Sequence, residues 1–218
     1  MRRLSGAWVA AIFAVAFSGA AQATVIFTSG NHPQPNEQNI MFETAQSGMT
    51  ITGDTNQTGT AVQFTSTQNL MTGGVGQAFL APVSPAATIT GKVTFSVPGF
   101  GFMDYIFNPM KGTGTALVTA LANDGSFTDD ITFGNGQNFL TITTSGGEFL
   151  TSVSITPDAN SSYDTYRQPR VSGLCTPGLA GCDLVPIPEP ATLALLGSAL
   201  VGFGAIGRRK PRRRTTSL

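Results

Sequence analysis

The side chains that could do catalytic chemistry begin with one histidine. His32 lies in the polar segment 31–35, which also contains two prolines. A Ser-His-Asp triad needs a histidine as its general base, and this chain has no other. The base would have to be presented from a loop near the N-terminus. We therefore interpret His32 as a surface residue and expect a protein that is not an enzyme.

The two cysteines are the next candidates. Cys175 and Cys182 enclose six residues, a spacing without the pattern of a structural zinc site. In an oxidising compartment such a pair favours a disulfide over two free thiols. Closing so short a loop stabilises by roughly 2–3 kcal/mol on the chain-entropy model. A nucleophilic cysteine would need a nearby base, so we predict a disulfide.

Asp124, Asp129 and Asp130 place several oxygen ligands close together in the sequence. Calcium prefers such clusters, although the spacing does not match an EF-hand loop. The tripeptide 123–125, Asn-Asp-Gly, is also typical of a turn. Adjacent residues on a strand point to opposite faces, which disfavours a catalytic carboxylate pair. We favour solvated turn carboxylates, keep a calcium site as the alternative, and predict no other cofactor.

Three aromatic residues form a candidate ligand platform: Phe100, Phe102 and Tyr105. Aromatic faces stack on sugar rings, which would suit a carbohydrate-binding surface. The alternative, which we favour, is that alternate aromatic side chains fill the core of a sandwich.

The elements that must position these residues have the pattern of strands. Residues 24–187 are rich in Thr, Ser, Gly and Asn, which disfavours long helices. Twelve of the fifteen Phe lie there, which disfavours disorder. Apolar and polar residues alternate with period two, as at Val93, Phe95 and Val97. The other expected strands are 24–27, 39–42, 49–52, 62–65, 77–80, 102–107, 115–121, 126–133, 138–144 and 149–155.

About ten short strands predict an all-β fold, an antiparallel β-sandwich of jelly-roll-like type. Residues 115–122 could instead form one short helix, because Ala and Leu are ambiguous in so short a run. The glycines of the segment 145–147 accept positive φ, so we expect a hairpin between 138–144 and 149–155.

The charge of the chain is unevenly distributed. Between Thr24 and Ile187 four basic residues stand against eleven acidic ones, a net charge of about −7. A nucleic-acid binder needs a basic face, so we expect no nucleic-acid partner.

The N-terminus has the pattern of a secretory signal peptide. Arg2 and Arg3 form a basic region, and residues 7–17 form a short apolar run. Ala21 and Ala23 then provide small-residue positions for cleavage before Thr24. Residues 1–23 are therefore predicted to be removed on export.

The C-terminus combines three features in a fixed order. Pro188, Glu189 and Pro190 precede residues 191–207, which carry no charge. As a helix those 17 residues would span about 26 Å, slightly less than a typical hydrocarbon core. A basic cluster follows, which the positive-inside rule keeps cytoplasmic. The cluster consists of Arg208, Arg209, Lys210, Arg212, Arg213 and Arg214.

This tail resembles the PEP-CTERM sorting signal of Gram-negative bacteria, also catalogued as an ice-binding protein C-terminal domain, a label that indicates no ice binding. The resemblance implies recognition by an exosortase, a membrane protease-transpeptidase, and cleavage near Pro188-Glu189-Pro190. It also implies a setting of exopolysaccharide and biofilm. Two further segments, 136–144 and 166–173, are similar to passages near the end of many such exported parts.

Together these observations predict four regions: a signal peptide (1–23), a β-sandwich passenger (24–174), a linker with a disulfide loop (175–187) and a sorting signal (188–214). We expect the secretion machinery, an exosortase and, transiently, the inner membrane as partners. The final location would be the cell surface or the extracellular matrix. There the passenger would act as a structural or adhesive protein in contact with exopolysaccharide. The first alternative is a carbohydrate-binding module with a defined sugar site, and the less favoured one is a secreted hydrolase.

Overall fold

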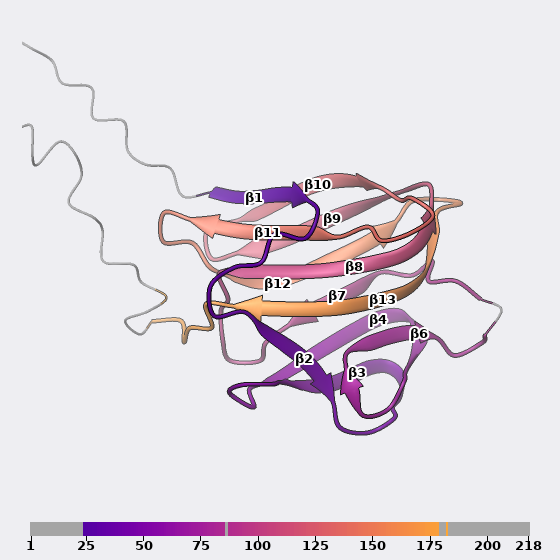
Figure 1. The fold of residues 1–218 in the computed structure, drawn as a ribbon. Helices are drawn as coiled ribbons and strands as arrows, with labels where there is room; N and C mark the ends of the chain where they lie inside the picture. Colours follow the sequence, from indigo (N-terminus) through magenta and orange to yellow (C-terminus); the bar gives the residue numbers. More distant parts are fainter. Residues whose placement is uncertain (1–23, 86, 179–181, 183–218) are drawn as a thin grey trace, which may run out of the picture. The chain divides into compact units, whose positions relative to one another are not determined.

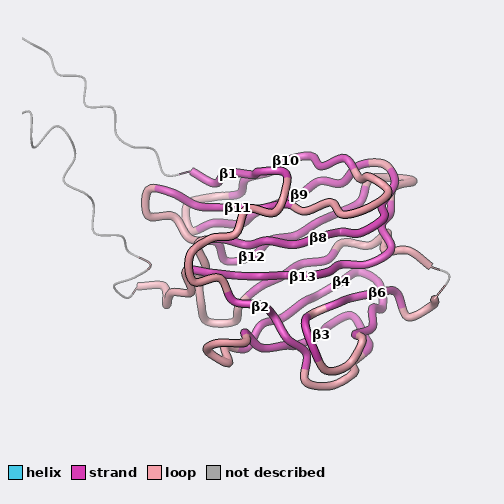
Figure 2. The backbone as a smooth tube through the Cα atoms, viewed as in Figure 1, coloured by secondary structure: helices cyan, strands magenta, loops and turns pink. Residues whose placement is uncertain are grey.

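The computed structural model describes residues 24–178, apart from residue 86, together with residue 182. Every regular element among them is a β-strand (Figure 2). None of these residues belongs to a helix long and apolar enough to cross a membrane. The thirteen strands are β1 (Thr24–Ser29), β2 (Gln38–Phe42), β3 (Ser47–Thr55), β4 (Ala61–Thr72), β5 (Gly76–Gln77), β6 (Phe79–Pro82), β7 (Val93–Ser96), β8 (Asp104–Thr113), β9 (Thr115–Ala122), β10 (Ser126–Thr132), β11 (Leu140–Ser145), β12 (Leu150–Pro157) and β13 (Ser162–Ser172).

The strands form two layers (Figure 1). One layer has the order β1-β11-β8-β13, and the other has the order β10-β9-β12-β7-β4-β3. Pairing continues from β13 through β2 to β3, so one path of strands folds back on itself. Every pairing is antiparallel. The predicted all-β antiparallel sandwich is confirmed.

Aromatic rings fill the space between the layers. Phe95 of β7 stacks on Tyr105 of β8 with their ring centroids 4.2 Å apart. Phe64 of β4 meets Tyr166 of β13 edge to face at 6.0 Å, and Tyr166 stacks on Phe107 of β8 at 5.2 Å. Each of these five rings is at most 2% exposed. Burying one such side chain stabilises by about 1.5–3 kcal/mol, so these rings supply much of the driving force for closing the sandwich.

Period-two alternation identified the strands that bury one face. Val93, Phe95 and Val97 are all buried, whereas Thr94 and Ser96 between them are not. The segment that could have been a helix is strand β9, with alternate residues buried.

The expected hairpin between 138–144 and 149–155 is wrong. Strand β11 pairs with β1 and β8, whereas β12 pairs with β7 and β9. The connecting turn therefore crosses from one layer to the other. Gly146 and Gly147 do have positive φ, at 71° and 96°. Because either connection needs such glycines, their presence did not distinguish a hairpin from a crossing turn.

Strand β13, which pairs with β8, β2 and β6, was not predicted as a strand. Its segment Arg167–Arg170 contains a proline, which removes a backbone donor. The structure accommodates Pro169 where the register between β13 and β8 shifts. Gln168 has a φ of 51° at this irregularity.

Buried tyrosine hydroxyls with and without a hydrogen-bond partner allow a prediction from two matched substitutions. Tyr163 is 0% exposed, and its hydroxyl has no hydrogen-bond partner among the described residues. The hydroxyls of Tyr105 and Tyr166 lie 2.7 Å apart and satisfy each other. Tyr163→Phe should therefore raise the free energy of unfolding by about 1 kcal/mol, and Tyr105→Phe should lower it by about 1–2 kcal/mol. Urea unfolding of both variants measures this, and a loss of stability in Tyr163→Phe would contradict it.

Candidate functional site

The loop between β1 and β2, residues 30–37, crosses the outer face of β11, β8 and β13 (Figure 2). We call it the strap. Thr141 Oγ1 donates to Gly30 O (2.8 Å) and accepts from His32 N (3.1 Å). Gly30 N also donates to Phe139 O (2.7 Å). These bonds hold the strap against the sheet, which leaves Thr141 1% exposed.

An ion pair fixes the end of the strap to β13. Arg170 Nη1 donates to Glu37 Oε2 at 3.0 Å, and the two side chains are 15% and 11% exposed. Arg170 Nη2 donates to Asn31 Oδ1, and its guanidinium carbon lies 5.9 Å from the centre of the Phe139 ring. Burial raises the pKa of Glu37, and Arg170 opposes this rise. The guanidinium is thus held in place with its charge balanced.

Beside this ion pair lies a surface hollow of about 300 Å³. Gln77 Nε2 donates to Asn39 Oδ1 across it at 3.0 Å. Gln168 Oε1 and Arg170 Nε are buried atoms of this lining and have no hydrogen-bond partner within the part of the chain that the structure describes. We call it the amide hollow, because most of its side chains are amides. Its lining residues are Asn31, Asn39, Gln77, Gln137, Phe139, Gln168 and Arg170.

The rim of the amide hollow is held by a second network. Asn108 on β8 is 0% exposed and its Oδ1 accepts from Asn138 N at 2.8 Å. The Asn138 side chain bonds to Gly134 N (2.6 Å) and to Pro109 O (2.8 Å). The loop that carries Gln137 and Phe139 is therefore tied to the middle of β8.

Sequence reasoning did not find the amide hollow. Its residues come from the strap, β2, β5, the loop before β11 and β13, which are far apart in the chain. Asn and Gln are ordinary surface residues, and no spacing between them marked the site. The register shift that presents Gln168 was also invisible without the pairing of β13.

The candidate aromatic platform is not assembled at the surface, and two of its three rings lie in the core, as in the interpretation that we favoured. Phe102 and Tyr105 are 0% exposed and pack against Phe95, at centroid distances of 5.3 and 4.2 Å. Phe100 is 38% exposed. The platform is therefore wrong for Phe102 and Tyr105, because alternate aromatic residues of a two-layer sandwich point into its core.

The three calcium candidates are not gathered into one ligand set. Asp129 and Asp130 are exposed on β10 and line a second hollow of about 470 Å³ beside residues 137–140. Asp124 lies in the turn before β10. No group of three or more His, Cys, Asp or Glu that could hold a metal occurs among residues 24–178 and 182 as described.

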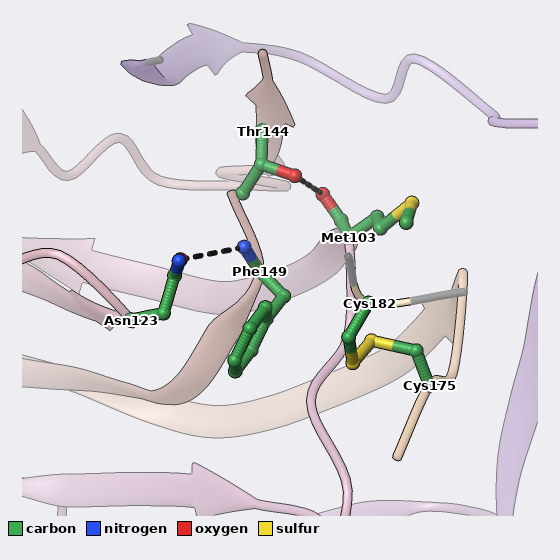
Figure 3. Close-up of a disulfide and its surroundings, with 6 residues drawn as sticks. All are labelled: Met103, Asn123, Thr144, Phe149, Cys175 and Cys182. Atoms are coloured by element: carbon green, nitrogen blue, oxygen red, sulfur yellow. Dashed lines mark hydrogen bonds between the residues drawn. A yellow bond between two sulfur atoms is a disulfide. The ribbon is translucent and has the colours of Figure 1, made fainter. Parts of the chain in front are cut away.

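A disulfide joins Cys175 to Cys182 (Figure 3). The two cysteines are 7% and 1% exposed and pack with Phe149. The backbone of Cys175 also exchanges two hydrogen bonds with Gly101, at 2.7 and 2.9 Å. The segment after β13 is thus fastened to the end of the sandwich.

The remaining predicted site residues lie outside the described part of the chain. These are the cleavage positions Ala21 and Ala23 and the sorting residues Pro188, Glu189, Pro190, Arg208, Arg209 and Lys210.

Comparison with known proteins identifies the tail. Residues 186–213 match the family model of the PEP-CTERM protein-sorting motif. The chain thus carries the sorting signal of an exported protein that an exosortase processes, and its described part is a β-sandwich. No curated protein matches the chain.

Solved structures give only distant likenesses. A mutant of CBM29-2, a family 29 carbohydrate-binding module, is 14% identical over 70% of this chain and 92% of that one, with a TM-score of 0.31. Another family 29 mutant is 13% identical over 76% and 99% of the two chains, with a TM-score of 0.29. The enzymatically active domain of tailspike protein 4 of bacteriophage CBA120 is 13% identical over 72% and 19%, with a TM-score of 0.22. Likenesses at this level assign no function.

Proposed function

We propose that this chain is an exported, non-enzymatic protein of the cell surface or extracellular matrix, and that its sandwich binds neutral polysaccharide in the amide hollow. An N-terminal signal peptide directs export, and the PEP-CTERM motif at residues 186–213 directs processing by an exosortase. The protein then acts as a structural or adhesive component among polysaccharide chains.

The observation that carries the polysaccharide proposal is the lining of the amide hollow. Five of its seven side chains are Asn or Gln, each of which offers both donors and acceptors. Sugar hydroxyl groups also donate and accept, so amides can bond to two neighbouring hydroxyls of one ring. The unpartnered atoms Gln168 Oε1 and Arg170 Nε supply one acceptor and one donor for such a ligand.

Charge favours a neutral ligand over an anionic one. Glu37 balances the guanidinium of Arg170, the one cation of the lining. The passenger as a whole carries about −7. An acidic polysaccharide would meet this negative field without a free cation to bind it. No Asp, Glu, Ser, Cys or His lines the hollow, so its chemistry favours binding over hydrolysis.

We expect Gln77→Ala combined with Gln137→Ala to weaken polysaccharide binding roughly tenfold or more, because each lost hydrogen bond is worth about 1 kcal/mol. Both residues are exposed, so the sandwich should remain folded. Calorimetry with neutral glucans, mannans, galactans and xylans measures the effect. Residues 24–185 can be used, because they contain all thirteen strands and residues 22–185 form one compact unit.

The matched control is Gln63→Ala, which removes an amide from β4 in the other layer. Its affinity should equal that of the wild type. If the wild-type domain binds none of these polysaccharides, or if the double variant binds as tightly as the wild type, the amide hollow is not a sugar site.

A further inference from the structure

Glu148, in the turn between β11 and β12, is a buried carboxylate without a counter-charge. It is 2% exposed, and neither of its carboxylate oxygens has a hydrogen-bond partner. Among the described residues it is the one carboxylate with both oxygens buried and unpartnered. The only ion pair there joins Arg170 to Glu37, so no basic side chain neutralises Glu148.

The group that faces Glu148 is a second carboxyl, that of Asp124. The pKa of Glu148 is raised to about 7, first by burial and then by the neighbouring Asp124 carboxyl. Two neighbouring carboxylates cannot both stay charged in a buried place without a compensating positive charge. Asp124 itself is exposed, so one side of the pair is open to solvent.

The two carboxyls are held together by the backbone. Asn123 Oδ1 accepts from Phe149 N at 3.0 Å, and Asn123 N donates to Phe149 O at 3.0 Å (Figure 3). This exchange locks the β9–β10 turn to the end of the β11–β12 turn. Phe149 packs in turn against the Cys175–Cys182 disulfide. The pair is therefore set in a rigid corner of the sandwich.

We propose that Asp124 and Glu148 bind one divalent cation, and that calcium is the ion that suits the site. Hard cations prefer carboxylate oxygens, and a buried bidentate Glu with an exposed Asp is a ligand combination that calcium accepts. Calcium also tolerates irregular geometry and takes its remaining ligands from backbone carbonyls and water. Magnesium demands a near-ideal octahedron, which two loop carboxylates do not supply. The site is separate from the amide hollow and does not depend on sugar binding.

The test is thermal unfolding of residues 24–185 after removal of metals with EDTA, followed by titration with calcium chloride. At a calcium concentration about 100 times the dissociation constant, the melting temperature should rise by about 5–10 °C. Calorimetry should give one ion per chain. Magnesium at the same concentration should give a smaller rise.

Glu148→Gln keeps the shape of the side chain and removes its charge, so the calcium response should disappear. Asp124→Asn changes an exposed residue, which the fold tolerates, and should weaken the response at least tenfold in calcium concentration. Asp130→Asn, an exposed carboxylate on β10, is the matched control and should respond like the wild type. A wild-type melting temperature that calcium does not change, or a full response in Glu148→Gln or Asp124→Asn, would overturn the proposal.

Discussion

Replacing Glu189 with alanine should leave the full-length precursor in the inner membrane of a host that contains an exosortase. Residues 186–213 match the PEP-CTERM sorting motif, and Glu189 is the only charged residue between Asp183 and Arg208. The flanking prolines lack backbone donors and have restricted φ, so the Glu189 carboxylate is the distinctive polar group of this segment. Without it, the uncharged segment 191–207 and the basic cluster remain, so we expect the protein to insert into the membrane but to escape processing almost completely.

Pulse-chase labelling with separation of membrane and released fractions measures this effect. Glu43→Ala removes an exposed carboxylate of the passenger and should be processed like the wild type. Glu189→Asp keeps the charge, so this variant should still be processed in part. Release of Glu189→Ala at the wild-type rate would show that the apolar segment and the arginines alone direct sorting.

The parts of the fold that sequence analysis predicted are those in which one face is buried. At Val62 and Phe64 the apolar residues alternate with polar ones, and the structure buries the apolar ones alone. Strand β8 shows no such alternation, since residues 104–109 are all buried. The strap covers the outer face of this strand, and nothing in the local sequence indicates that cover. Strand order also stayed unpredicted, because it depends on which distant segments pair.

The candidate sites were less predictable than the strands. Phe102 and Tyr105 were candidates for a sugar platform, yet a core aromatic and a ligand platform have the same sequence pattern. Asp124 was a calcium candidate, but Glu148, its neighbour in space, lies 24 positions away and was not considered. The physical reason is common to both cases. A site depends on which side chains share an environment, and the crossing turn at 145–149 sets that environment only in three dimensions.

The second large effect is a loss of stability as the pH rises, and Asp104→Asn should remove the part of this loss that comes from Asp104. Asp104 is 5% exposed on β8 beneath the strap, and its Oδ1 has no partner. Its pKa is raised from 3.8 to about 7, first by burial and then by the neighbouring charge of Glu37. Ser172 Oγ donates to Asp104 Oδ2. A hydrogen bond from the Ser172 backbone only partly opposes the rise in pKa.

The direction of the effect follows from the protons bound in each state. Between pH 3.8 and 7 the folded protein keeps the Asp104 proton that the unfolded chain has lost, so stability falls as the pH rises through this range. The ionisation of Asp104 alone should lower the free energy of unfolding by about 2–3 kcal/mol between pH 5 and pH 8. An asparagine cannot ionise, and its amide oxygen can still accept from Ser172. Asp104→Asn should therefore be more stable than the wild type at pH 8 and nearly equal to it at pH 4.

Urea unfolding in EDTA gives the free energy of unfolding at pH 5 and at pH 8, and the change between them is the slope for each protein. The contribution of Asp104 is the difference between the slopes of the wild type and Asp104→Asn. Burial and Asp124 also raise the pKa of Glu148 to about 7, so the wild-type slope contains a second term of the same sign. Subtracting the slope of Asp104→Asn removes that term, because Glu148 is unchanged in both proteins. Asp129→Asn on the exposed side of β10 should keep the full wild-type slope. Equal slopes for the wild type and Asp104→Asn would mean that the strap does not bury a protonated carboxyl, and that Glu37 and Arg170 fasten it without help from Asp104.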